Sequence, residues 1–102
     1  MSGWYILDNN NKPIPASITE AADWLEEGSD RRTVKRDEIG DILVSTVFLG
    51  LDHSFPWNED KTPVLWETMI FGGEHDQYQE RYTSHKDALE GHKKALTLIT
   101  KE

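Results

Sequence analysis

Glu67 is the residue whose chemistry stands out most clearly from its surroundings. It interrupts an apolar strand pattern that runs from Val64 to Phe71. An unpaired carboxylate is costly to bury, so Glu67 needs a partner. Arg81, on the strand expected beside it, can supply a bidentate, charge-assisted hydrogen bond. Two interpretations stay open: a structural ion pair or partly exposed edge position, and a carboxylate that binds a ligand or transfers a proton.

His92 is the second candidate, because it shares the apolar stripe of a C-terminal helix. A histidine in that position is more often a hydrogen-bonded core residue than a catalytic base. We expect its partner to be a strand carbonyl, Ser45 or Thr68. Gly91 beside it predicts a close approach of this helix to the sheet or to an aromatic ring, because glycine is otherwise unfavourable inside a helix.

The remaining histidines do not predict a metal centre. His53 and His75 follow opposite ends of the expected hairpin and are too far apart to share an ion. His85 can approach Asp52 and His53, but no pair of histidines has the i, i+4 spacing of a helical metal site. We therefore predict no metal and no cofactor.

Taken together, these residues define one hypothetical polar site for a small molecule: His53, Glu67, Arg81 and His92. The sequence contains no nucleophile elbow and no pair of carboxylates with catalytic spacing, so no catalytic residue is assigned. An enzyme is neither supported nor excluded, and the balance favours a protein without catalytic activity.

A predicted helix from Ile18 to Glu27 offers a different kind of site. Its outer side carries Glu20, Asp23 and Glu27. With Trp57 from a later loop, these are the candidate residues for contact with a protein partner. Four basic residues follow the helix at once, so intramolecular neutralisation is the simpler alternative; they are Arg31, Arg32, Lys35 and Arg36.

The amino-acid composition limits the kinds of partner that this protein is expected to bind. Nineteen acidic and eleven basic residues give a formal charge of −8, which argues against nucleic acid and anionic lipid as partners. The chain has no cysteine, which excludes disulfides and thiolate chemistry. No apolar stretch approaches the roughly 20 residues of a membrane helix. These features predict a cytoplasmic protein that does not bind membranes.

The elements expected to position these residues form one α+β domain over residues 1–102, in the order β-α-β-β-β-β-α. The capping-box pattern from Ser17 to Glu20 begins the first helix, and its buried stripe is expected to comprise Ile18, Ala21, Ala22, Trp24 and Leu25. Residues 37–41 are expected to form a turn. The other elements are strands over 4–7, 33–36, 42–51, 64–71 and 78–82, and a helix over 85–100.

The expected fold is a mainly antiparallel sheet of four to five strands with two helices on one face. The strands over 42–51 and 64–71 are apolar on both sides, so the second face of the sheet needs a cover. Either a homodimer through the sheet or the loop over 52–62 can supply it.

Several segments together resemble a group of small proteins encoded by tailed bacteriophages and prophages. The resembling segments are residues 44–53, 65–73, 81–83 and 88–92, in about half of the chain. Trp66 stands where this pattern leads us to expect phenylalanine. The resemblance implies a viral setting and carries over no activity. It draws attention to the polar residues Asp52, His53, Glu67, Thr68, Arg81, Tyr82 and His92.

The leading hypothesis is therefore a non-enzymatic interaction protein that binds or modulates a host or phage protein in the cytoplasm of an infected cell. The alternative is a small-molecule-binding protein or small enzyme with the polar site around Glu67, Arg81, His53 and His92. The first hypothesis predicts a contact surface, and the second predicts a pocket.

Overall fold

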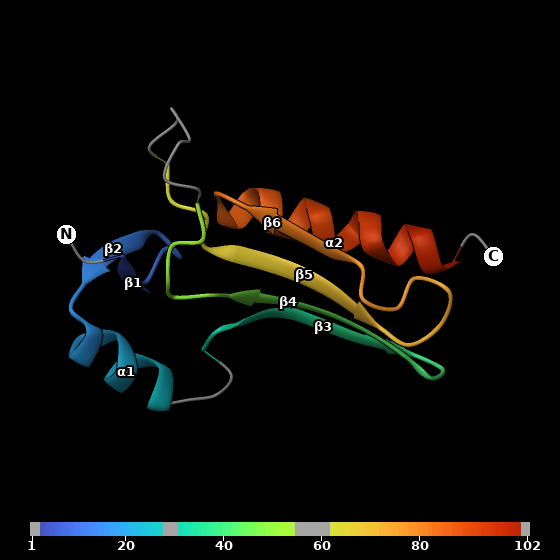
Figure 1. Cartoon of the computed structure of the whole chain (residues 1–102), viewed down its shortest axis with the longest axis horizontal. Coiled ribbons are helices and arrows are strands. Elements are labelled where there is room, and N and C mark those ends of the chain that lie inside the picture. The colour runs from blue at the N-terminus through green and yellow to red at the C-terminus, as the bar shows by residue number, and fades with distance from the viewer. Residues whose placement is uncertain (1–2, 28–30, 55–61, 101–102) are drawn as a thin grey trace.

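The computed structural model describes residues 3–27, 31–54 and 62–100 and shows an α+β fold, as predicted. A central antiparallel sheet lies beside helix α2, while a small hairpin and helix α1 gather at one end (Figure 1). The elements in chain order are β1 (Trp4–Leu7), β2 (Pro13–Ala16), α1 (Ile18–Glu26), β3 (Thr33–Ile39), β4 (Ile42–Phe48), β5 (Trp66–Phe71), β6 (Gln79–Tyr82) and α2 (His85–Thr100).

The main sheet has four strands in the order β3-β4-β5-β6, and every neighbouring pair is antiparallel. The expected pairing of β4 with β5 is confirmed, with Thr46 opposite Thr68. Strand β3 is longer than predicted, because the connection to β4 is only Gly40-Asp41, with Gly40 at φ +60°. Asp37 was expected in a turn, but it lies inside β3 opposite Val44.

Strand β2 was missed by sequence reasoning. Its two prolines lack backbone N–H groups, so the segment looks like a loop, although prolines are tolerated in an edge strand. The Asp8 carboxylate accepts hydrogen bonds from the backbone N–H groups of Asn10 and Lys12 and closes the β1–β2 turn. Strand β1 ties this hairpin to the rest of the protein, since the Tyr5 N–H donates to the Gly50 carbonyl.

Helix α1 begins with the predicted capping box: the Ser17 N–H donates to Glu20 Oε1 and the Glu20 N–H donates to Ser17 Oγ. Its buried stripe is narrower than expected. Ala21 is buried and Trp24 and Leu25 are half-buried, but Ile18 is 62% exposed, and Ala22 is exposed as well. The reason is that α1 packs on the narrow β1–β2 hairpin, and it reaches the main sheet through the edge of Trp24 against Phe48.

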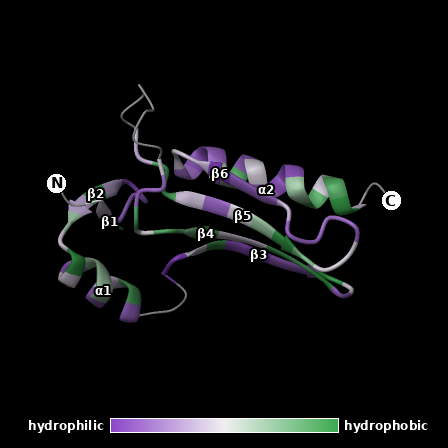
Figure 2. Ribbon diagram, viewed as in Figure 1, coloured by the Kyte–Doolittle hydropathy of each residue, from purple (hydrophilic) through white to green (hydrophobic). Residues whose placement is uncertain are grey.

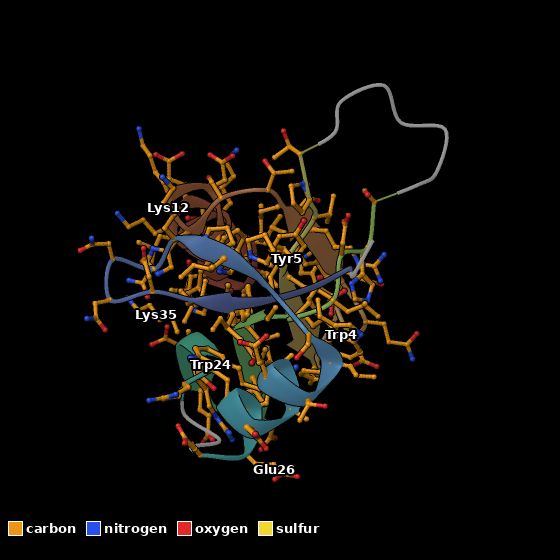
Figure 3. The ribbon with its side chains drawn as sticks, turned by 90° about the vertical axis from the view of Figure 1, so that its left-hand side faces the viewer. Trp4, Tyr5, Lys12, Trp24, Glu26 and Lys35 are labelled. Carbon is orange, nitrogen blue, oxygen red and sulfur yellow. The ribbon has the colours of Figure 1, made fainter. Side chains whose placement is uncertain are left out.

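The view from this end shows α1 below the hairpin, with Glu26 on the side of α1 that points away from the hairpin (Figure 3). Trp24 meets the Phe48 ring edge-on at 5.6 Å between centroids. Phe48 also contacts Trp66, and both lie in one hydrophobic cluster with Leu65 and Ala88. Both helices therefore contact the same face of the main sheet, α2 along its length and α1 at one end.

Helix α2 seals this face. The sheet residues beneath it are fully buried: Val44, Thr46, Phe48, Trp66, Thr68 and Ile70. As predicted from Gly91, the helix comes very close to an aromatic ring, because a Cβ at Gly91 would overlap the ring of Tyr82. The hydrophobic core is divided into two clusters, one around Phe48 and Trp66 and the other around Val44 and Ile70.

The opposite face of the sheet is composed differently. Hydropathy varies along its strands, and β3 is largely hydrophilic (Figure 2). Within the described ranges neither helix packs on this face, since α2 covers the other one and α1 contacts β1 and β2. Its inner side chains are half-buried, and Phe71 is 44% exposed. The 52–62 loop, one of the two expected covers, falls largely outside the described residues.

Candidate functional site

The space between the two hydrophobic clusters is filled by a row of hydrogen-bonded polar side chains. His92 Nδ1 lies 2.7 Å from Thr46 Oγ1, which lies 2.5 Å from Thr68 Oγ1. At the other side of the ring, His92 Nε2 lies 2.7 Å from Asp37 Oδ2. His92 and both threonines are fully buried, while 36% of the Asp37 side chain is exposed. We call these four residues the polar row.

The polar row confirms that His92 is a hydrogen-bonded core residue and corrects its partners. Neither Ser45 nor a strand carbonyl bonds it; Thr46 and Asp37 do. Thr68 joins the row only through Thr46. Asp37 was missed because residues 37–41 were assigned to a turn, and Thr46 because a threonine in an apolar strand pattern fits a core position without any special role.

We assign the direction of each hydrogen bond in the polar row by starting from Asp37. An ionised Asp37 only accepts hydrogen bonds, so His92 Nε2–H donates to it. In the neutral ring Nδ1 is then an acceptor, so the Thr46 hydroxyl donates to His92 and the Thr68 hydroxyl donates to Thr46. Carboxylate, imidazole and hydroxyl stand in the order of a nucleophilic triad. The hydroxyl is sealed in the core, so this arrangement organises the fold and does not present a nucleophile to a substrate.

Glu67 and Arg81 form the predicted ion pair, but through one contact and not the expected bidentate one, with Arg81 Nε 2.9 Å from Glu67 Oε2. Gln79 Nε2 donates to the same oxygen at 2.5 Å. The Glu67 side chain is 12% exposed and that of Arg81 39%. Because side chains alternate along a strand, Glu67 lies on the opposite face of the sheet from its neighbour Thr68 and from the polar row. The sheet therefore separates Glu67 and Arg81 from His92.

His53 lies in a third place, at the base of the loop between β4 and β5. Its Nδ1 is 2.6 Å from the Leu51 carbonyl, and its backbone N–H donates to the Val64 carbonyl. The four residues of the predicted polar site therefore do not converge. His85, expected to approach His53, has its ring 6.5 Å from that of Trp66. The described part of the chain contains no group of three or more side chains able to hold a metal ion.

Asp52 closes the same loop, a role that sequence reasoning missed. Its carboxylate accepts hydrogen bonds from the Ser54 N–H, the Ser54 hydroxyl and the Val64 N–H, at 2.8 to 3.0 Å. Burial raises the pKa of Asp52, but these hydrogen bonds, with a contribution from His53, outweigh burial and lower the pKa below its ordinary value of 3.8. The spacing of Asp52 and Ser54 is typical of an Asx-turn and offered a local signal.

Some of the acidic side chains of α1 already have partners within the protein. Glu20 serves the capping box, and hydrogen bonds from the backbone and side chain of Ser17 lower its pKa. Glu27 pairs with Arg31 at 3.2 Å, and the Arg31 guanidinium lies 5.5 Å from the centre of the Trp24 ring. Asp23 is exposed. Trp57 lies outside the described residues.

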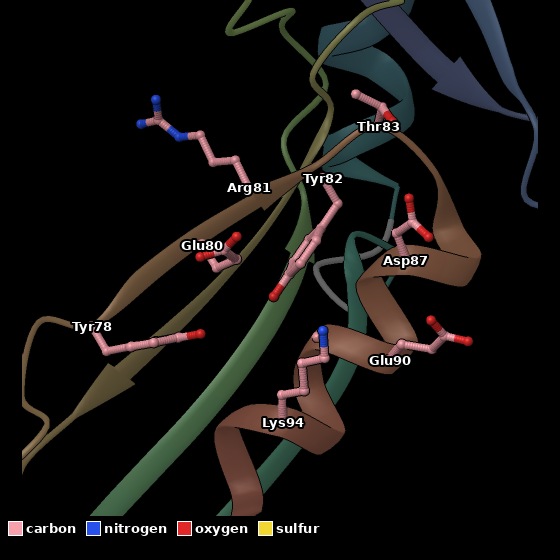
Figure 4. Close-up of a pocket in the computed structure, with 9 residues that line it drawn as sticks. Tyr78, Glu80, Arg81, Tyr82, Thr83, Asp87, Glu90 and Lys94 are labelled. Atoms are coloured by element: carbon pink, nitrogen blue, oxygen red, sulfur yellow. The ribbon is translucent and has the colours of Figure 1, made fainter. Parts of the chain in front are cut away.

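A cleft of about 460 Å³ separates β6 from α2 (Figure 4). The Tyr82 ring stands between the strand and the helix, and its hydroxyl is buried without a well-formed hydrogen bond to any described residue. Burial raises the pKa of Tyr82; Thr68 opposes this shift, and Tyr78 and Glu80 add to it. The size is ordinary for a ligand pocket, but such pockets are mostly apolar, and charged side chains dominate here. Of the predicted site it contains Arg81 alone.

The face of the main sheet on which no described helix packs remains to be considered, and we call it the open face. Its centre contains apolar and small side chains, and its sides carry two ion pairs, Arg36–Glu38 at 3.0 Å and Glu67–Arg81 at 2.9 Å. By strand register it comprises Thr33, Arg36, Glu38, Leu43, Ser45, Val47, Glu67, Met69, Phe71, Gln79 and Arg81.

Comparisons with protein-family models, curated proteins and solved structures find no match for this chain. Among the described residues, no helix has the length and apolar character needed to cross a membrane.

Proposed function

We propose that this protein is a non-enzymatic interaction protein that binds another protein through the open face of its sheet. The observation that carries the proposal is the contrast between the two faces. One face is sealed by α2 over fully buried side chains. The other leaves Leu43, Val47 and Met69 half-buried and Phe71 44% exposed, with neither described helix packed on it. Contiguous exposed apolar surface of this kind is typical of a contact site.

The polar residues support an interaction role over catalysis. Thr46 and His92 have no exposed surface. Glu67 is held by Arg81 and Gln79, and Asp52 by three hydrogen bonds at the base of its loop. These four polar groups therefore hold the fold together, and the separation of His53, Glu67 and His92 does not favour a shared small-molecule site.

The open face is also a better contact surface than the acidic helix. On α1, Glu20 and Glu27 already have intramolecular partners. The open face instead combines an apolar centre with polar sides, the arrangement that protein interfaces commonly show. The resemblance to tailed-phage proteins supports a host cell as the setting and a host or phage protein as the partner.

The test compares three single substitutions in a tagged chain captured gently from bacterial cells and analysed by native mass spectrometry. Met69→Lys places a charge at the centre of the open face. Thr97→Lys is the matched control on the exposed side of α2, and Asp23→Lys tests α1. Far-ultraviolet circular dichroism and the urea midpoint verify that each variant is folded.

We expect the original chain and Thr97→Lys to retain a stoichiometric protein partner, whether a second copy or another protein, and Met69→Lys to lose it. Retention of the partner by a folded Met69→Lys variant would contradict the proposal. Loss of the partner in Asp23→Lys alone would move the contact surface to the acidic helix.

A further inference from the structure

Building on the proposed function, we infer that the protein that occupies the open face is a second copy of this chain, in a dimer with two-fold symmetry. A two-fold interface requires a surface that is complementary to itself. The open face meets this requirement in its charge, in the placement of its charged residues and in its size.

The open face is neutral although the chain carries a formal charge of −8. Its four charged side chains form two ion pairs, Arg36–Glu38 and Glu67–Arg81, so their charges sum to zero. Two copies repel each other wherever their acidic surfaces approach. The neutral face is where they can meet with the least repulsion, whereas a basic partner would be attracted to acidic surfaces elsewhere.

The register also places opposite charges where two-fold symmetry can use them. Glu38 lies on edge strand β3 opposite Leu43, and Arg81 lies on edge strand β6 opposite Glu67, at the other end of the sheet. Glu38 and Arg81 therefore occupy diagonally opposite corners of the open face. A two-fold axis that lies between the two sheets, along the other diagonal of the open face, places Glu38 of each copy over Arg81 of the other. This gives two equivalent charge contacts around an apolar centre.

The size of the open face suits a weak dimer. The four strands have seven, seven, six and four residues; at roughly 3.3 Å per residue and about 4.8 Å between strands they give a footprint of roughly 380 Å². Side-chain relief makes the accessible area larger than this footprint, and a standard interface buries about 800 Å² on each partner. The open face lies below this standard size, where weak interfaces are found, so we expect a dissociation constant in the micromolar range.

The first experiment is sedimentation velocity over a concentration series, at low and at high NaCl. We expect a monomer–dimer equilibrium that becomes tighter as NaCl rises, because salt screens the repulsion between two chains of charge −8, and this outweighs the screening of the two weak Glu38–Arg81 contacts. Met69→Lys should weaken the dimer by more than about tenfold, because symmetry buries the new charge twice. Thr97→Lys should leave the dimer unchanged.

The second experiment locates the interface, and the absence of cysteine makes it clean. Ser45→Cys puts a single thiol at the centre of the open face, opposite Met69, and Thr97→Cys is the control on the outer side of α2. Packed sheets lie about 10 Å apart, too far for a direct disulfide, so a short bis-maleimide is the cross-linker. We expect rapid covalent dimers from Ser45→Cys and few from Thr97→Cys.

The outcomes separate this inference from the proposed function. A chain that stays monomeric up to about 1 mM overturns the dimer, yet the proposed function stands if Met69→Lys still loses a different captured protein. A dimer that survives Met69→Lys, or that cross-links equally well through Thr97→Cys, uses another surface and overturns the inference. If Met69→Lys also keeps every captured partner, the proposed function fails with it.

Discussion

The polar row makes a quantitative prediction about Thr46, because this residue is the link between His92 and Thr68. Thr46→Val keeps the shape and the β-branched character of the side chain but removes the shared hydroxyl. It leaves His92 Nδ1 without a donor in the core, and it takes from the Thr68 hydroxyl the acceptor that Thr46 provides, so that only the poorly formed contact with the Tyr82 hydroxyl is left to it. An unsatisfied buried polar group costs about 1–3 kcal/mol, so we expect a loss of about 2–6 kcal/mol.

Thr68→Val is the matched comparison at the end of the row. It removes one hydrogen bond, but the Thr46 hydroxyl still donates to His92, so we expect a loss of about 1 kcal/mol. In the double variant only His92 Nδ1 is unpaired, because the hydroxyl stranded by the first change is also gone. The double variant should therefore be more stable than the sum of the single effects predicts, by at least about 1 kcal/mol.

Urea unfolding followed by tryptophan fluorescence measures these differences, since Trp24 and Trp66 both contact Phe48 in the core. A domain of this size has a total stability of about 5–15 kcal/mol, so Thr46→Val removes a large part of it. The slope of the unfolding free energy against urea concentration should be the same in all variants, so that a shift of the urea midpoint measures a change in stability. If Thr46→Val costs no more than Thr68→Val and the two effects add, the polar row is not the coupled network described above.

Three further predictions concern Gly91, Asp52 and Ser17. Gly91→Ala should destabilise the protein by about 1–2 kcal/mol, because the new Cβ displaces Tyr82. In a Tyr82→Ala background the same change should stabilise the protein by about 1 kcal/mol, which is the usual preference of a helix for alanine over glycine. The urea midpoints of the four chains test this reversal. The pKa of Asp52 is lowered in the folded state, so the stability that its carboxylate contributes is complete above the ordinary pKa of 3.8 and is lost as the pH falls through the pKa of the folded state. The loss of stability in Asp52→Ala, relative to the original chain, should therefore be full at pH 7 and shrink below about pH 4. Ser17→Ala removes the N-cap of α1 and should cost about 1 kcal/mol in the same assay.

The sequence predicted those parts of the fold that are coded locally. The capping box of α1, the alternation along β4 and β5 and the glycine beside an aromatic ring each depend on a few neighbouring residues, and all three are confirmed. The partner of Glu67 was also predicted, because adjacent strands and opposite charges suffice to identify Arg81.

What the sequence could not predict depends on contacts between distant segments. Asp37 and His92 are 55 positions apart, and nothing local marks Asp37 as part of a strand. Ile18 and Ala22 fit an apolar helical stripe, but the width of the buried stripe depends on the partner, which is a two-stranded hairpin. The separation of His53, Glu67 and His92 likewise follows from strand register and from the alternation of faces.

The polar row and the open face are connected through that register. Thr46 can hydrogen-bond both Thr68 and His92 only when the two threonines stand opposite one another in the β4–β5 pair. A slip of one residue turns every side chain of a strand to the other face, so it would break the row and also remove Met69 from the open face. The buried row on one side thus selects the arrangement of side chains on the other. A contact surface built on a sheet with a single, fixed register is organised before its partner arrives, which lowers the entropy that binding has to overcome.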